Sequence, residues 1–191
     1  DQKTGLEISE SKSSVATEYP VMAAIGQSDN NYTTVALSRY VTAVASGKKY
    51  NYQLMNKIVD ADGKTVKKYK ADYEDISDTL TDSQWDALHS GMRQVVSTMD
   101  RFQGFDIPVA GKTGTAQQTG HANHGLFVGY APYDDPEITI AVRIANGYSS
   151  HNAATAARNV ISYYYKETSM KDIKEMKAAG VNGNTRNSVA D

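Results

Sequence analysis

Lysine, threonine, glycine and threonine follow one another within the stretch Val109–Gln117. The apolar flanks of this stretch predict a strand. Alternate residues of a strand share a face, so Thr113 and Thr115 are expected on one face and Lys112 on the other. Hydroxyl groups beside an ammonium group suit a carboxylate. At a sheet edge, Gly114 would let another backbone approach, and an extended peptide could pair with the strand. The pattern predicts an edge-strand site for a peptide or a carboxylate.

The triplet Lys-Thr-Gly is weakly specific by itself. A second copy lies at residues 3–5, in a polar stretch near the start of the chain and without a strand pattern around it. The copy at 112–114 therefore gains its weight from the elements that position it.

Composition excludes several kinds of chemistry. The chain has 191 residues, with 20 Lys and Arg against 22 Asp and Glu, and this net charge of −2 lacks the basic excess typical of nucleic-acid-binding domains. It has no cysteine, which excludes a disulfide scaffold, a cysteine-ligated zinc site, an iron–sulfur cluster and a thiol nucleophile. Its longest apolar runs, such as 21–25, are too short to span a membrane. The composition is that of a globular domain.

Helical and strand-like patterns alternate in the first part of the chain. Apolar residues at helical spacing predict a helix that begins after Thr33 or Thr34 and ends at Gly47. A strand is expected over 50–59, followed by a turn at 60–63 and a hairpin partner or exposed loop.

The next helix has the clearest start. This helix is expected from Asp82 to about Met99. Thr81 and Gln84 form a possible capping box at its start, and the helix has one apolar face. Trp85 lies on this face and is expected in the core.

In the remainder of the chain, the pattern of apolar residues predicts strands and then one last helix. Strands are expected over 109–117, 125–131 and 137–145, and a helix over 152–166. The residues of that helix expected to face inward are Ala153, Ala157, Val160, Ile161 and Tyr164. Together these elements predict an α+β fold in which an antiparallel sheet is flanked by helices.

Two histidines at His-x-x-His spacing, His121 and His124, raise the question of a metal site. No cysteine or nearby acidic cluster offers further ligands. We therefore interpret them as part of a polar loop between two strands, and the sequence predicts no metal or other cofactor.

The context of the 109–117 strand carries a family resemblance. It is followed by the block His124-Gly125-Leu126-Phe127-Val128-Gly129-Tyr130-Ala131-Pro132 and preceded by Ala24-Ile25-Gly26-Gln27 with Tyr32-Thr33. In this order the blocks resemble the C-terminal part of the transpeptidase domain of class B penicillin-binding proteins, which cross-link peptidoglycan. The resemblance covers about 4–165. It implies a penicillin-binding-protein/serine β-lactamase-like fold, with 1–167 as an incomplete transpeptidase domain and 168–191 as a polar, mobile tail.

The resemblance also implies a mechanism. The intact domain would bind the D-Ala-D-Ala end of a peptidoglycan stem peptide, form an acyl-enzyme through a serine, and be acylated by β-lactams. Lys112 would hydrogen-bond a serine of the family's second motif. The hydroxyl of Thr113 or of Thr115 would hold the substrate carboxylate, and the backbone N–H of Thr115 would supply half of the oxyanion hole. Gly114 would keep the strand edge open.

The family's other motifs occur literally but in unsuitable places. Ser-x-x-Lys is matched at 9–12 and 46–49, and Ser-Asp-Asn at 28–30. Ser9 has no apolar helical period around it, Ser46 lies beside the Gly47 helix stop, and Ser28 falls inside a block that follows the second motif in the family. We therefore expect the nucleophile to lie upstream of this chain, and the chain alone to be inactive.

The resemblance further implies partners and a location. The partners would be the stem peptide, β-lactams and the missing N-terminal part of the same domain, and the parent protein would be membrane-anchored and extracytoplasmic. Without upstream strands, the strand over 137–145 would expose a bare edge, so self-association is expected. Two alternatives stay open: a non-catalytic peptide- or β-lactam-binding (sensing) domain, and a compact serine hydrolase that uses Ser9 or Ser28.

Overall fold

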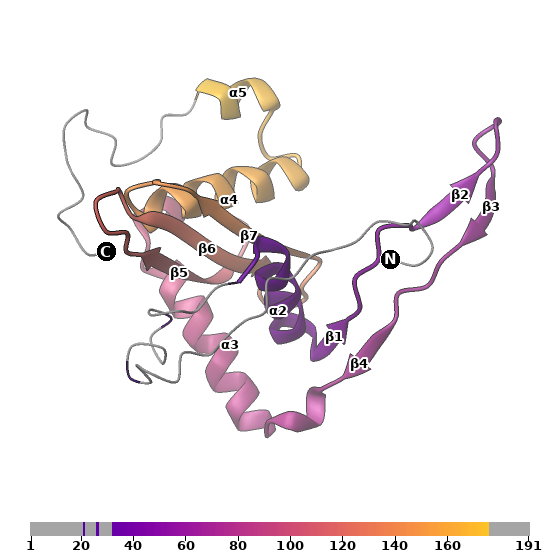
Figure 1. The fold of residues 1–191 in the computed structure, drawn as a ribbon, viewed down its shortest axis with the longest axis horizontal. Helices are drawn as coiled ribbons and strands as arrows, with labels where there is room; N and C mark the ends of the chain where they lie inside the picture. The colour runs from indigo at the N-terminus through magenta and orange to yellow at the C-terminus, as the bar shows by residue number, and fades with distance from the viewer. Residues whose placement is uncertain (1–20, 22–25, 27–31, 176–191) are drawn as a thin grey trace.

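The computed structural model describes residues 21, 26 and 32–175 of the chain (Figure 1). Within this part no helix is long and apolar enough to cross a membrane. Two short 3₁₀ helices, η1 (Ser77–Thr79) and η2 (Asp100–Phe102), flank the long helix α3. The other elements, in chain order, are α2 (Thr34–Ser46), β1 (Lys48–Tyr50), β2 (Lys57–Val59), β3 (Thr65–Lys68), β4 (Tyr73–Asp75), α3 (Asp82–Ser97), β5 (Ala110–Ala116), β6 (His124–Ala131), β7 (Ile138–Ile144), α4 (Ser150–Tyr164) and α5 (Met170–Glu175).

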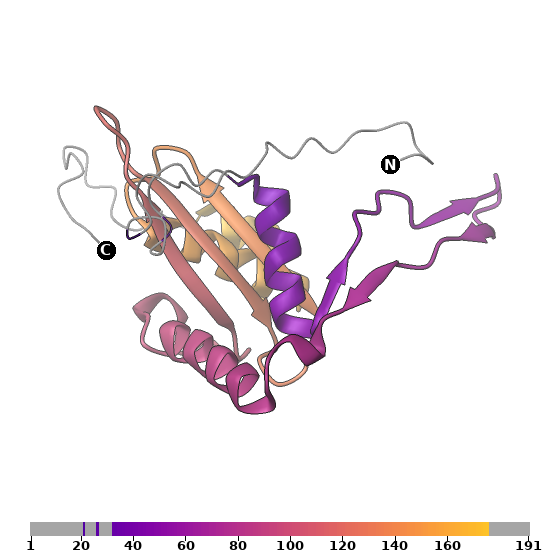
Figure 2. The ribbon, with the colours of Figure 1, turned by 60° about the horizontal axis from the view of Figure 1, so that its bottom comes forward.

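The main sheet has the order β5-β6-β7, and both pairs of strands are antiparallel. Helix α4 covers the face that carries Phe127, and α2 crosses the opposite face, where Val41 packs on Tyr130 (Figure 2). Helix α3 contributes to both layers, with Val96 in the first cluster and Met92 against the second. This arrangement confirms the predicted α+β fold with an antiparallel sheet flanked by helices.

Local capping explains where the first two helices begin and end. The Thr33 hydroxyl accepts the Ala36 N–H at 3.1 Å, and Gly47 closes α2 in the left-handed conformation with φ 65°. At the start of α3, the Thr81 N–H donates to the Gln84 side-chain oxygen at 2.9 Å. Both predicted starts and the predicted stop at Gly47 are confirmed.

The strand predicted over 50–59 is wrong in its extent. The chain forms β1 and then β2, with irregular backbone over 51–56 between them. β1 pairs with β4 and β2 pairs with β3, and the tight turn at 60–63 joins the latter two strands. The pattern was misleading because alternation reports one continuous face, whereas these two strands belong to different two-stranded ribbons.

The inward face predicted for the last helix is partly wrong. Val160 is 49% exposed and Tyr164 50% exposed. The residues buried against the sheet include Ala153, Ala154, Ala157 and Ile161. One step along a helix turns a side chain by about 100°, so burying Ile161 against the sheet turns Val160 toward solvent.

The assignment of 168–191 as a polar, mobile tail stays a prediction. Within 168–175 the chain forms the short helix α5, which the sequence pattern did not predict, and 176–191 lie outside the described residues.

Glycines let the elements approach closely. A Cβ on Gly125 of β6 would overlap the Ser149 carbonyl oxygen at the start of α4, whereas a Cβ on Gly91 of α3 would meet no atom within 4 Å. Gly125 therefore serves packing, and Gly91 does not.

We expect Gly125→Ala to lower the free energy of unfolding by about 1–3 kcal/mol, because the backbone of the β7–α4 loop must move. Gly91→Ala, in the matched control, should raise it by about 0.5–1 kcal/mol through helix propensity. Urea titration of the chain followed by circular dichroism measures both. Equal stability of the two variants would contradict this account.

Candidate active site

Strand β5 carries the predicted site and lies at an edge of the sheet in the described part of the chain. Lys112 is exposed, and the three residues after it are partly buried. In the register with β6, Lys112 lies opposite Val128, and Thr113 lies opposite Phe127. Side chains of paired residues share a face, so Lys112 and Gly114 lie on the α2 side of the sheet, and the two threonines on the α4 side. The predicted alternation is confirmed.

The ammonium group of Lys112 has no carboxylate partner among the described residues. Its Nζ atom donates to the carbonyl oxygen of Thr113 at 2.9 Å, so the side chain bends back over its own strand. A carbonyl oxygen leaves the positive charge uncompensated. The charge is therefore available to an anion that approaches the β5 edge.

Gly114 is not required by the packing of the described residues. A Cβ at this position would lie 3.5 Å from the Leu126 Cβ, which is ordinary contact. Gly111, three residues earlier on the same strand, is different: there a Cβ would lie 2.5 Å from the Phe127 ring. The bare backbone at Gly114 thus leaves room beside the strand without serving the core.

The start of β5 is held by α3 and α2. The Arg93 guanidinium donates to the Val109 carbonyl at 3.0 Å. His89 joins α3 to α2 through a 2.8 Å hydrogen bond to the Val44 carbonyl, and its ring lies edge-on to buried Tyr130 at 6.0 Å. Burial raises the pKa of Tyr130 to about 12, with a smaller contribution from Tyr133. This clamp fixes the backbone that precedes Lys112.

A loop between β7 and α4 borders the other end of the strand. His124, opposite Ala116, accepts the Asn146 N–H on Nδ1 at 3.0 Å. Asn146 and Tyr148 both have positive φ, 52° and 66°, a conformation that non-glycine residues rarely adopt. The loop lies against Gly125, which pairs with Thr115. No local pattern in the sequence signals this contact, because His124 and Asn146 are 22 residues apart.

Of the literal Ser-x-x-Lys motifs, only 46–49 lies within the described residues. The Ser46 hydroxyl donates to the Thr42 carbonyl at 2.7 Å, and Lys49 forms a 2.9 Å ion pair with Glu74. Serine and lysine thus have separate structural partners. The triplet at 3–5, Ser9 with Lys12, and Ser28-Asp29-Asn30 lie outside the described residues. Among the described residues, no three potential ligands from His, Asp and Glu come together as a metal site.

Trp85 lines an open groove rather than the closed core. The groove, of about 1100 Å³, lies between α2, α3 and the segment that carries β1 and β4. The Trp85 indole N–H donates to the Ser77 carbonyl at 2.8 Å, so this ring is fixed. The α2–α3 groove has a largely apolar lining that includes Leu37, Tyr40, Leu80, Trp85 and Leu88.

Comparison with known proteins gives the same family throughout. A family model described as the penicillin binding protein transpeptidase domain matches residues 1–162. The peptidoglycan D,D-transpeptidase MrdA of Haemophilus influenzae is 29% identical over 170 residues, which are 77% of this chain and 26% of that protein. The chain thus spans about a quarter of the length of this relative.

Solved structures agree. Pseudomonas aeruginosa PBP2, in complex with WCK 5153, matches with TM-score 0.61 and 31% identity over 76% of this chain and 34% of that one. Penicillin-binding protein A from M. tuberculosis, an imipenem acyl-enzyme complex, matches with TM-score 0.67 and 22% identity over 75% of this chain and 33% of that one. The latter likeness concerns the fold alone.

The His124 contact predicts a pH dependence of stability. Burial, and then the charge of Arg143, lower the pKa of His124 from 6.5. The unfolded chain then binds this proton more readily than the folded chain, so the free energy of unfolding should fall as the pH drops below about 6.5 and level off below the folded-state pKa. His124→Asn, which can keep an acceptor for Asn146 without titrating, should lose this slope, and His121→Asn at an exposed position should keep it. Urea titrations between pH 4 and 8 test this, and an unchanged slope in His124→Asn would contradict it.

Proposed function

The chain belongs to the penicillin-binding-protein transpeptidase family, and from this we propose that it supplies the Lys112 strand of a serine D,D-transpeptidase site. The observation that carries the proposal is the β5 edge, where Lys112, whose ammonium group has no carboxylate partner among the described residues, lies on the same side of the strand as the bare backbone of Gly114. Both features suit a site for a peptide that ends in a carboxylate.

We assign roles to the β5 residues as follows. The Lys112 ammonium hydrogen-bonds a serine of the second family motif and attracts the substrate carboxylate. The hydroxyls of Thr113 and Thr115 contact that carboxylate. The Thr115 N–H stabilises the oxyanion that forms when the nucleophilic serine attacks the penultimate carbonyl of the stem peptide. Gly114 lets the substrate backbone lie close to the strand.

In the proposed reaction the serine oxygen forms an ester with the peptide carbonyl and the C–N bond to the terminal D-Ala breaks, releasing that amine with a proton. An amino group of a second stem peptide then attacks the ester and restores the serine hydroxyl. β-Lactams would acylate the same serine. We propose that this reaction takes place outside the cytoplasm, in a membrane-anchored parent protein.

We propose that the nucleophile belongs to a part of the transpeptidase domain beyond this chain, and that this part covers three open surfaces. They are the β5 edge, the α2–α3 groove and the outer edge of β7. β7 pairs only with β6 among the described residues, and bare edges and apolar grooves favour association. The same surfaces would let the isolated chain self-associate.

Two other functions make different predictions. A non-catalytic sensing domain would bind a peptide or β-lactam at the β5 edge without forming a covalent bond. A compact serine hydrolase would acylate Ser9 or Ser28. The separate partners of Ser46 and Lys49 in the one described motif favour neither alternative.

Intact-mass spectrometry of the chain after incubation with excess benzylpenicillin should show no added mass, because the nucleophile lies elsewhere. A stoichiometric adduct would contradict the proposal, and peptide mapping would then identify Ser9 or Ser28. A longer protein that contains this chain and the rest of the domain serves as the positive control and should gain one penicilloyl group.

In that longer protein, Lys112→Ala should lower the rate of acylation by benzylpenicillin at least about a hundredfold, the order of effect of removing one electrostatic contact in an active site. Lys171→Ala on the exposed helix α5 is the matched control. Thr113→Val and Thr115→Val compare the two hydroxyls. An unchanged rate of acylation in Lys112→Ala would contradict the role assigned to this strand.

A further inference from the structure

A slender arm projects from the body of the molecule (Figure 1). It consists of the β1/β4 ribbon followed by the β2/β3 hairpin. All residues of β2, β3 and β4 are exposed. Isolated two-stranded hairpins are marginally stable in water, so the outer hairpin gains no stability from a core of its own.

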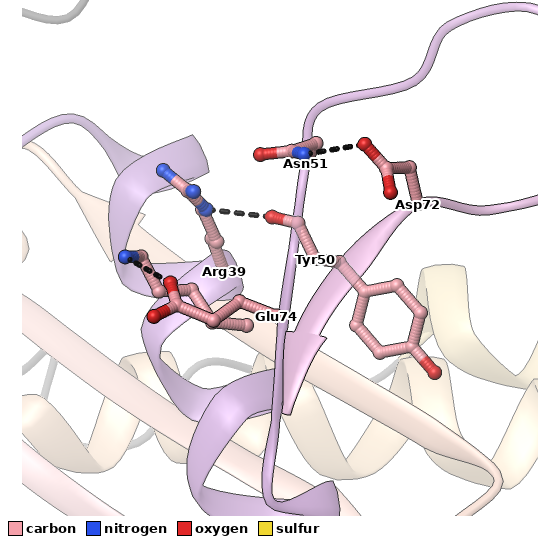
Figure 3. A network of polar contacts seen from close by, with 6 residues as sticks. Arg39, Tyr50, Asn51, Asp72 and Glu74 are labelled. Atoms are coloured by element: carbon pink, nitrogen blue, oxygen red, sulfur yellow. Dashed lines mark hydrogen bonds and ion pairs between the residues drawn. The ribbon is translucent and has the colours of Figure 1, made fainter. Parts of the chain in front are cut away.

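The base of the arm is nevertheless fixed to the body. The Arg39 side chain on α2 donates to the Tyr50 carbonyl at 2.7 Å, and Asn51 donates to Asp72 at 2.8 Å (Figure 3). Lys49 and Glu74 form an ion pair across the β1/β4 ribbon at 2.9 Å. These contacts hold the β2/β3 hairpin away from the sheet.

The outer hairpin places like charges together. Lys57 lies directly opposite Lys68, and such a pair is destabilising. Val59 lies two residues after Lys57 and Val66 two residues before Lys68, next to a register shift that brings Thr65 opposite Val59. Val59 is 45% exposed and Val66 67% exposed. We call these four residues, Lys57, Val59, Val66 and Lys68, the hairpin face.

The charge of the arm differs from that of the rest of the chain. Residues 56–71 contain five lysines and two aspartates, a net charge of +3, whereas the whole chain carries −2. Among the described residues neither Lys57 nor Lys68 takes part in an ion pair. Repulsion between two lysines beside exposed valines is relieved when carboxylates approach from a partner.

We propose that the hairpin face docks an extended acidic segment of a partner protein. Carboxylates of that segment lie between Lys57 and Lys68, and an aliphatic side chain covers Val59 and Val66. An extended segment that lies across the hairpin face fits, because its alternate residues share one face and can meet first the lysines and then the valines. The alternation of charge and aliphatic groups along the hairpin face matches that period.

The test uses the full chain and a fluorescein-labelled peptide with the repeat Glu-Thr-Val-Thr, in which glutamate and valine follow one another along a single face of the extended chain. Binding is measured by fluorescence anisotropy. The wild-type chain should bind this peptide and not the same peptide with glutamine in place of glutamate. Lys57→Gln with Lys68→Gln should weaken binding at least tenfold, as should Val59→Thr with Val66→Thr. Lys57→Arg with Lys68→Arg keeps both charges and should bind the peptide as the wild-type chain does. Far-ultraviolet circular dichroism checks that each variant is folded.

Lys171→Gln with Lys174→Gln on α5 removes the same charge elsewhere and should change binding less than twofold. Two results would overturn the proposal. One is no binding of the peptide that carries glutamate and valine, and the other is an equal loss of binding in the hairpin and α5 lysine-to-glutamine variants. Vesicles of phosphatidylglycerol provide the other arm of the test. Vesicle binding that depends on Lys57 and Lys68, with no binding of the peptide, would assign the hairpin face to a lipid surface and also overturn it.

Discussion

The ring of Phe127 lies against two glycines, Gly129 on its own strand β6 and Gly111 on the neighbouring strand β5, which leave space for it. A Cβ on either glycine would come within 2.8 Å of the ring, and the ring itself is fully buried, stacked at 5.9 Å on Phe102. This contact holds β5, β6 and the helical layer together. Slipping the strands by one residue would drive side chains into the ring, so the register of β5 is tightly specified.

The register in turn decides which groups reach the edge. With Thr113 opposite Phe127, the next residues alternate so that Lys112 and Gly114 lie on the α2 side. The clamp made by Arg93 and His89 keeps the start of the strand in place. The candidate site therefore depends on the position of the β5 backbone and on the Lys112 ammonium group, which has no carboxylate partner among the described residues.

Four lysines of the arm and of β5 differ in their partners. Lys49 forms an ion pair with Glu74 and joins the two strands at the base of the arm. Lys112, Lys57 and Lys68 have no carboxylate beside them among the described residues. Exposed ion pairs contribute little to stability. We therefore explain the charges of Lys112, Lys57 and Lys68 by the binding of anionic groups and not by a contribution to folding stability.

Much of the fold can be predicted from short stretches of the sequence. Thr33, Gly47 and Thr81 mark helix ends because their hydrogen bonds join residues a few positions apart, and alternation over 109–117 identifies the strand and its two faces. The ordered blocks around that strand also indicated the family. Tertiary structure alone decided the break between β1 and β2, the exposure of Val160, the contact of His124 with Asn146 and the opposition of Lys57 and Lys68. These features depend on strand register and on helix rotation against partners distant in the chain, which no local pattern encodes.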